Sequence, residues 1–318
     1  MAGAPIIRLD NRQPVLANLR GAIIAMGNFD GFHAGHQAVV GRAMEWARAE
    51  GRPAIVATFD PHPMRLFKPD TPPFRLTTLD QRERLFAAAG ADAMLVFHFD
   101  QALAGKTAEG FVDLLVKDIG AVGVVTGEDF TFGKGRSGNI ESLKTLGAGA
   151  GLRSEAVAPV KNDNGTVISS SAIRDALKRG DCAAAARLLT RPFTIEGKVL
   201  HGDKLGRTLD FPTANMELGN YQRPAYGVYA VRGCLPDGKV VDGVANIGIR
   251  PMFDPPRELL ESYLFDFSGD LYDQAIEVQL IGYIRPEMKL DGLDALKAQI
   301  AKDCDAARQI LAETPPLP

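Results

Sequence analysis

Two histidines stand close together where an apolar segment gives way to a glycine-rich turn. In residues 25–40, AMGNFDGFHAGHQAVV, His33 and His36 lie at positions i and i+3, and Gly31 and Gly35 lie beside them. The glycines let the backbone approach a ligand closely, and the helix that follows offers unpaired N–H groups. Two imidazoles there can stabilise charge that develops on a phosphate. The residues therefore favour a phosphate-binding turn, with half of a zinc site or ordinary turn histidines as alternatives.

A second polar pair lies in the other half of the chain, in the sequence FPTAN. Thr213 and Asn215 lie at i and i+2, so in an extended segment their side-chain oxygens face the same side. A hydroxyl and an amide oxygen are hard ligands, which suit the Mg²⁺ bound to the phosphates of ATP. The pattern therefore indicates a magnesium–nucleotide site, and a β-turn with an exposed asparagine is the alternative.

Further polar groups occur near glycines and near predicted helix starts. ISSSAIR, residues 168–174, predicts the start of a helix whose hydroxyl and N–H groups could bind a triphosphate, within reach of Arg174. By itself this pattern is more typical of a plain N-cap. In GEDFTFG, Asp129 could meet a phosphate through a metal or cap a turn. Phe130 and Phe132 could line a pocket, although aromatic residues at this spacing are more often core.

The first half of the sequence alternates strand-like and helix-like segments. Its short apolar runs predict strands, and the segments between them contain strong helix formers and end at glycines. Near-continuous apolar strands separated by helices are typical of a parallel sheet covered on both faces, which binds ligands at the carboxyl ends of its strands. The predicted strands are 21–27, 53–59, 93–99, 122–127 and 154–160, and the predicted helices are 36–51, 80–90 after Thr77 and Thr78, 108–120 and 138–151.

The pattern changes after about residue 185 to short runs of alternating residues separated by Gly, Pro, Asp and Asn. Such runs predict an antiparallel sheet or a small barrel. Residues 291–311 follow these runs, and the spacing of Leu293, Leu296 and Ile300 predicts an amphipathic terminal helix.

The length of 318 residues suits two domains. We expect an α/β fold with a doubly wound domain at residues 1–185 and a small antiparallel β-barrel with a terminal helix at residues 186–318. The net charge of −3 gives no global reason to bind nucleic acid or an anionic membrane, so we expect neither as a partner. Cys182, Cys234 and Cys304 form no C-x-x-C pair. No segment has the pattern of a signal peptide or a membrane span, and we expect a cytoplasmic protein.

Several motifs, in the same order, resemble those of the bacterial bifunctional riboflavin kinase/FMN adenylyltransferase (FAD synthetase) family. GNFDGFHAGH is similar to the HxGH loop of the nucleotidyltransferase superfamily, in the form that this family has. The other matching motifs are TFDPHP, TGEDFTFGKGRSG, ISSSAIR, GDKLGRTLDFPTAN, LLESYLFDF and IRPEMKL. The resemblance extends from about Gly21 to about Asp303, and it implies a Rossmann-like nucleotidyltransferase domain followed by a riboflavin kinase barrel.

For the first half, the resemblance implies transfer of an adenylyl group from ATP to FMN, which yields FAD and pyrophosphate. His33 and His36 would hold the ATP phosphates as the transition state forms, and Arg174 would grip the triphosphate tail. Mg²⁺ would neutralise phosphate charge in this half as in the other. The other residues implied to bind nucleotide or flavin are Gly27, Asn28, Phe29, Asp30, Gly35, Asp129, Ser169 and Ser170.

For the second half, the resemblance implies phosphorylation of riboflavin by ATP, which yields FMN and ADP. Glu261 falls on the family's catalytic base and would accept the proton of the ribityl 5′-hydroxyl. Without the resemblance, Glu261 is more typical of an outward charge on an antiparallel strand. The remaining residues of this site are Thr213 and Asn215, which would hold Mg²⁺–ATP, and Gly202, Lys204 and Arg207, which would surround the phosphates.

Some residues of the second half depart from the family's pattern. Leu205, Asp210, Met252 and Tyr263 stand where Arg, Gly, Thr and His are usual, and Leu290 stands where Phe is usual. Two alternatives therefore stay open: an FMN adenylyltransferase whose kinase half has decayed, and a flavin-binding regulator with no catalysis. The retained histidines, the PTAN motif and Glu261 argue against the regulator.

Overall fold

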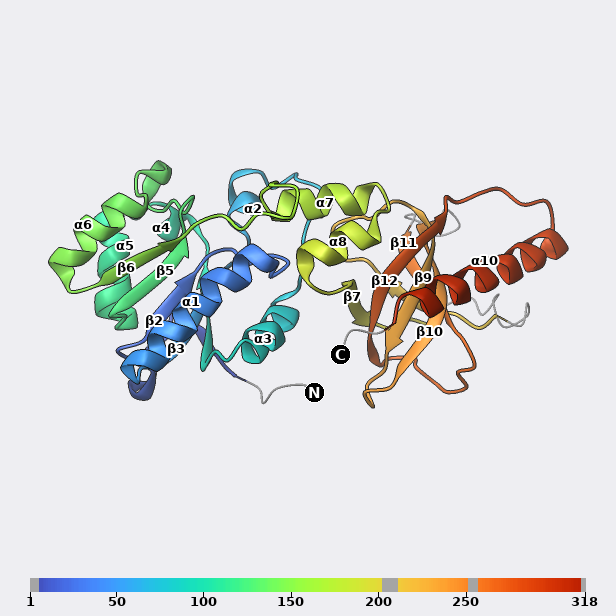
Figure 1. The fold of residues 1–318 in the computed structure, drawn as a ribbon, viewed down its shortest axis with the longest axis horizontal. Helices are drawn as coiled ribbons and strands as arrows, with labels where there is room; N and C mark the ends of the chain where they lie inside the picture. Colours follow the sequence, from blue (N-terminus) through green and yellow to red (C-terminus); the bar gives the residue numbers. More distant parts are fainter. Residues whose placement is uncertain (1–5, 202–210, 251–256, 316–318) are drawn as a thin grey trace. The chain divides into compact units, whose positions relative to one another are not determined.

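A computed structural model describes residues 6–201, 211–250 and 257–315 of the chain (Figure 1). The chain divides into two compact units, one of Met1–Pro72 with Thr78–Ser169 and the other of Pro73–Thr77 with Ser170–Pro318. Each unit has its own sheet and its own hydrophobic core. None of the helices that the structure describes combines the length and the apolarity that crossing a membrane requires.

The first unit contains a six-stranded parallel sheet in the order β1-β4-β3-β2-β5-β6. Successive residues of β2 are buried on opposite faces, because Ile23 packs with the helices at residues 34–50 and 79–88 while Ile24 packs with those at residues 108–113 and 140–150. Both faces of the sheet are therefore covered, which confirms the predicted doubly wound arrangement. The strands are β1 (Ile7–Asp10), β2 (Ile23–Met26), β3 (Ala54–Asp60), β4 (Ala93–His98), β5 (Gly123–Gly127) and β6 (Arg153–Val157).

Capping side chains set where helices of the first unit begin. For example, α3 begins after Thr78, whose side chain forms a capping box with Gln81. The predicted helix at 108–120 is an α-helical segment that continues as a π-helical segment. The helices are α1 (Ala34–Glu50), α2 (Pro63–Phe67), α3 (Leu79–Ala88), α4 (Gln101–Ala104), α5 (Ala108–Asp113) and α6 (Ile140–Ala150), with η1 (Ala17–Leu19), η2 (Leu114–Ile119) and η3 (Lys134–Arg136).

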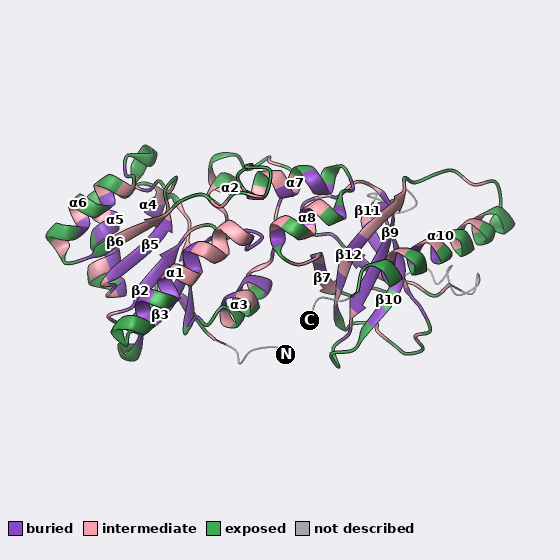
Figure 2. Cartoon of the chain, in the orientation of Figure 1, coloured by how far each residue is buried: buried purple, intermediate pink, exposed green. Residues whose placement is uncertain are grey.

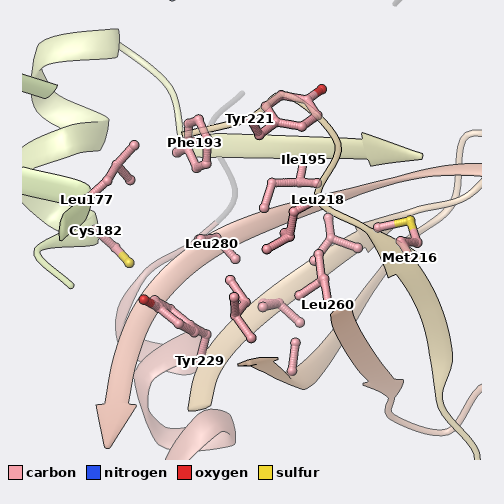
Figure 3. Packing of buried hydrophobic residues seen from close by; sticks show 14 of the residues in the cluster. Leu177, Cys182, Phe193, Ile195, Met216, Leu218, Tyr221, Tyr229, Leu260 and Leu280 are labelled. Atoms are coloured by element: carbon pink, nitrogen blue, oxygen red, sulfur yellow. The ribbon is translucent and has the colours of Figure 1, made fainter. Parts of the chain in front are cut away.

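The second unit contains a six-stranded antiparallel sheet in the order β7-β12-β9-β10-β11-β8. Just beyond β7, Leu200 forms a bridge with Asn215 of β8, so the two edge strands meet and the sheet is nearly closed. Ile195, Tyr229 and Leu260 are among the side chains that fill its interior (Figure 3). The structure thus confirms the predicted small barrel. Its elements are α7 (Ser170–Lys178), α8 (Cys182–Leu189), β7 (Phe193–Lys198), β8 (Ala214–Glu217), β9 (Gly227–Cys234), β10 (Val240–Arg250), β11 (Arg257–Leu264), β12 (Ala275–Arg285) and α10 (Leu293–Glu313).

The terminal helix α10 packs along the outer surface of the barrel. Its buried stripe contacts the outward residues of β9 and β10, whereas its other face is exposed (Figure 2). Two arginines of the barrel hold it in place. Arg285 forms a bidentate pair with Asp303, at 2.8 and 2.7 Å, and Arg232 donates a hydrogen bond to the carbonyl of Leu311 at 3.0 Å.

Asp303→Ala should destabilise the second unit by about 3 kcal/mol, because it leaves the Arg285 guanidinium partly buried and without its carboxylate partner. Urea unfolding followed by circular dichroism measures the loss. Fluorescence of Trp46, the only tryptophan, reports unfolding of the first unit separately. The matched control is Asp305→Ala on the same helix, where the aspartate side chain is 84% exposed, with an expected effect below about 0.5 kcal/mol. Equal losses in the two variants would contradict this account.

Candidate active sites

The histidine turn lies at the carboxyl end of β2, where α1 begins. His33 is the N-cap of α1, and its Nδ1 accepts a hydrogen bond from the backbone N–H of His36 at 3.3 Å. The two imidazole rings are stacked, with centroids 3.6 Å apart and planes inclined by 19°. The ring of Phe29 meets the His36 ring edge-on at 5.2 Å. Both predicted histidines thus lie together at the N-terminus of a long helix, where the partial positive charge favours an anion.

The capping bond also determines where the neutral His33 imidazole carries its proton. A neutral imidazole has one N–H, so an Nδ1 that accepts a hydrogen bond places the proton on Nε2. His33 is only 5% exposed. The arrangement can therefore present an Nε2–H donor to an anionic oxygen.

Gly35 allows two groups to approach the first turn of α1 closely. A Cβ atom at this position would lie 3.2 Å from Cε1 and Nδ1 of His33 and 3.5 Å from the carbonyl oxygen of Ile168. Most Cβ contacts are longer than 3.2 Å, so a side chain at Gly35 would displace the His33 imidazole. Ser169 directly follows Ile168 in the chain, which places this predicted phosphate ligand next to the histidine turn.

The segment between β2 and the histidines is held by residues that the sequence did not identify. Asn28 exposes its side chain, while its backbone carbonyl accepts hydrogen bonds from Thr58 Oγ1 at 2.8 Å and from Arg82 Nη1 at 3.2 Å. Asp30 is buried. A sequence signal for Arg82 does exist, because it lies four residues before Phe86 on the side of α3 that apolar spacing predicts to be buried.

The other predicted residues of the adenylyl site lie on separate elements. Asp129 is exposed just beyond β5, and its Oδ1 lies 2.9 Å from the point where a Cβ of Gly127 would be. Ser170 begins α7, which belongs to the second unit. On the same helix, Arg174 donates from Nε to the carbonyl of Phe74 at 2.8 Å, and its guanidinium lies 5.3 Å from the centre of the Phe74 ring.

In the second unit, the register of three strands places polar residues in a row. Glu261 of β11 lies opposite Asn246 of β10 on one side and opposite Asn215 of β8 on the other. Residues directly opposite each other share a face of the sheet, and this face is the outer one because the neighbouring Leu260 fills the interior. The Asn215 Oδ1 atom is buried and has no hydrogen-bond partner among the described residues.

Arg250 connects this row to a second carboxylate. Its Nε donates to Glu261 Oε2 at 2.8 Å, its Nη1 donates to Glu287 Oε1 at 3.2 Å, and Asn246 Nδ2 donates to the same Glu287 oxygen at 3.1 Å. Glu287 lies so close to Gly248 that a Cβ there would be 2.1 Å from Oε1. Burial lowers the pKa of the Arg250 guanidinium, but the hydrogen bonds and charges of Glu261 and Glu287 outweigh burial and raise it.

A cavity of about 70 Å³ adjoins the start of β8. Thr213 and Ser262 contribute to its polar side, and Phe267 and Tyr272 contribute aromatic rings. Ser262 is 1% exposed, and its Oγ has no hydrogen-bond partner in the described part of the chain. Thr213 therefore borders a cavity with a buried hydroxyl, that of Ser262, which can still form a hydrogen bond.

Some predicted residues lie outside the described residues, namely Gly202, Lys204 and Arg207 together with the departures Leu205, Asp210 and Met252. Another departure, Tyr263, is described, and its ring lies edge-on to those of Phe211 and Phe265. Within the described ranges, no three His, Cys, Asp or Glu side chains are grouped to bind a metal.

Two family models match the chain: FAD synthetase over residues 15–172 and riboflavin kinase over residues 189–311. The bifunctional riboflavin kinase/FMN adenylyltransferase of Escherichia coli K12 is 42% identical, over 93% of this chain and 95% of that protein. The protein of the same name from Bacillus subtilis is 38% identical, over 89% and 90%. A crystal structure from Streptococcus pneumoniae, described as a macrolide-efflux protein, has the same fold, with 30% identity, 95% and 99% coverage and a TM-score of 0.85.

Proposed function

Because the chain belongs to the bifunctional riboflavin kinase/FMN adenylyltransferase family, we infer that it makes FAD from riboflavin in two steps. The kinase step transfers the γ-phosphoryl group of ATP to riboflavin and gives FMN and ADP. The adenylyltransferase step transfers the adenylyl group of a second ATP to FMN and gives FAD and pyrophosphate. Matches over both halves of the chain support both activities, rather than one working half or a non-catalytic regulator.

The stacked His33–His36 pair is the observation that carries the assignment of the adenylyl step to the first unit. An oxygen of the FMN phosphate attacks the α-phosphorus of ATP, and the bond to pyrophosphate breaks as the new P–O bond forms. No covalent intermediate is needed, so positioning and charge stabilisation supply the rate. The Nε2–H of His33 and backbone N–H groups at the start of α1 donate to the phosphate oxygens as charge develops on them.

The neighbouring residues have supporting roles in this proposal. Gly27 and Gly35 keep the backbone close to the phosphates, and Asn28 directs its exposed side chain toward the nucleotide. Phe29 contacts His36 and fixes the orientation of that ring. The roles of Asp30, Asp129, Ser169, Ser170 and Arg174 in binding nucleotide remain predictions from the sequence.

Glu261 is the residue that we assign as base in the kinase step. It accepts the proton of the ribityl 5′-hydroxyl as that oxygen bonds to the γ-phosphorus and ADP leaves. Both hydrogen bonds from Arg250 go to Oε2 of Glu261, so in the described part of the chain Oε1 is the oxygen that can take the proton. Arg250 thereby orients the base, and Glu287 in turn orients Arg250.

Asn215 fits the Mg²⁺ that accompanies ATP. A buried Asn215 Oδ1 without a partner among the described residues is a hard oxygen ligand whose bonding capacity is unused. When bound, Mg²⁺ neutralises phosphate charge during transfer. Asn215 would hold it in the row that contains Glu261, and the role of Thr213 as a second ligand remains a prediction from the sequence.

His36→Ala should lower the rate of FAD formation from FMN and ATP at least about 100-fold, because it removes one group of the phosphate-binding pair. The same variant should still convert riboflavin to FMN at close to the normal rate. Chromatography of flavins after separate incubations with FMN and with riboflavin measures both steps. Equal loss of the two activities would show that the two reactions do not have separate sites.

Glu261→Gln should give the opposite result. The amide keeps the shape of the side chain but cannot accept the proton, so kcat for FMN formation should fall about 10²- to 10⁴-fold. FAD formation from supplied FMN should be unchanged. The matched control is Glu217→Gln in β8, where the glutamate side chain is 57% exposed and pairs with Arg257. FMN formation at the normal rate in Glu261→Gln would exclude it as the base.

Asn215→Ala should raise the Mg²⁺ concentration needed for half-maximal FMN formation by about tenfold or more, since even outer contacts to a bound metal are worth about that much. The measurement is the rate of FMN formation across a Mg²⁺ titration at saturating ATP. Supplied FMN provides the control, because the Mg²⁺ dependence of FAD formation should not move. An unchanged Mg²⁺ midpoint for FMN formation would refute Asn215 as a ligand.

A further inference from the structure

One face of α3 packs against the loop that carries the histidines. Arg82 and Phe86 are at i and i+4, so they share a face of the helix, and they are 1% and 0% exposed. A completely buried arginine is rare because taking a guanidinium out of water costs free energy unless each of its donors finds an acceptor. The acceptors that this arginine uses therefore indicate why it is present.

Arg82 donates to the segment that leads into the histidine turn. Its Nη1 donates to the Asn28 carbonyl at 3.2 Å and to Thr58 Oγ1 at 2.8 Å, and Thr58 Oγ1 donates to the same carbonyl at 2.8 Å. Its Nε donates to the carbonyl of Thr78 at the start of α3. Arg82 therefore joins three elements, because Thr58 belongs to β3 and Asn28 follows β2.

Phe86 packs against two aromatic side chains of the same loop. Its ring lies edge-on to those of Phe29, at 5.8 Å, and Phe32, at 5.2 Å. Both loop residues have left-handed backbone angles, with φ of 47° and 45°. Bulky residues rarely adopt this conformation, and it persists only where surrounding contacts enforce it.

The contacts continue from the loop to the histidines. The Phe29 ring that packs on Phe86 also meets the His36 ring, and His36 is stacked on His33. A change in the path of the backbone at Asn28 would move Phe29, and the stacked pair with it. Near a reacting phosphate, a displacement of about 1 Å can cost about 100-fold in rate.

We propose that Arg82 is a positioning residue for adenylyl transfer, which fixes the Asn28 carbonyl and thereby the placement of His33 and His36. This inference rests on the proposed role of the histidine turn in the adenylyl step. A methionine would fill most of the same volume without a buried charge, so packing alone does not call for arginine here. The guanidinium is needed because it donates hydrogen bonds both to the Asn28 carbonyl on the loop and to Thr58 Oγ1 on β3.

Arg82→Met tests the proposal. We expect kcat for FAD formation from FMN and ATP to fall about 100-fold, with smaller changes in the KM values, because the groups that are displaced act mainly in the transition state. Arg82→Lys keeps a cationic donor and should recover at least about tenfold of the loss, although lysine cannot reproduce the full fork of donors. FMN formation from riboflavin should be unchanged in both variants.

Folding of the first unit is monitored in the same samples. Trp46 is the only tryptophan, and it lies in the same buried cluster as Phe29, Phe32 and Phe86. Its emission spectrum and its thermal transition should therefore show that each variant is folded at the assay temperature. The matched control is Arg84→Met, the same chemical change at an exposed position of α3, and it should leave both activities unchanged.

A double-mutant cycle separates positioning from a general loss of stability. Thr58→Val removes the hydroxyl that both receives the Arg82 donor and contacts the Asn28 carbonyl, while it keeps nearly the same volume. If both residues act through that carbonyl, the double variant should lose much less than the product of the two single losses. Independent, multiplicative losses in kcat would overturn the proposal.

The remaining outcomes are also decisive. If folded Arg82→Met makes FAD at the normal rate while His36→Ala does not, the proposal fails and the assignment of the histidine turn stands. If both variants make FAD normally, the assignment of the turn is wrong and the proposal fails with it. A loss in Arg82→Met that Arg82→Lys does not recover, or that accompanies an altered Trp46 transition, would also overturn it.

Discussion

The hydrogen bond from the His36 N–H to the His33 Nδ1 is the contact on which the chemistry of the first unit depends. It caps α1, it stacks the two imidazoles, and it leaves the His33 proton on Nε2. The rest of the unit makes this one contact possible. The parallel sheet brings the loop to a strand end, Gly35 gives the ring its space, and α3 supports the loop from the buried side.

In the second unit, the register of the strands positions the candidate catalytic residues. Antiparallel register sets Asn215, Glu261 and Asn246 opposite one another on three strands. Because side chains alternate across a sheet, the same register buries Leu260 and Ser262 on the other face. A shift of one residue in β11 would replace Glu261 in this row by Leu260 or Ser262, so the register that closes the barrel also forms the site.

Much of this arrangement could be predicted from local patterns. Apolar runs interrupted by glycines identified the parallel sheet, alternation identified the barrel, and Thr78 marked the start of α3. Arg82 and Thr58 were not identified as site residues, because an arginine in a helix is usually exposed and a threonine in a strand carries no chemical signature. The link between Arg250 and Glu287 was also missed, since these residues lie 37 positions apart.

The sequence by itself determined which residue types are available and what chemistry they can perform, because glycines, histidines, Thr213, Asn215 and Glu261 carry that information in their identity and spacing. Only the tertiary structure decided which oxygen of Glu261 is engaged by Arg250, which atom of His33 is a donor, and which buried side chains hold the Asn28 carbonyl. The physical reason is the distance along the chain over which each kind of interaction acts. Capping and alternation act between neighbours in the chain, whereas a buried guanidinium finds its acceptors on whichever strands the packing of the core brings next to it.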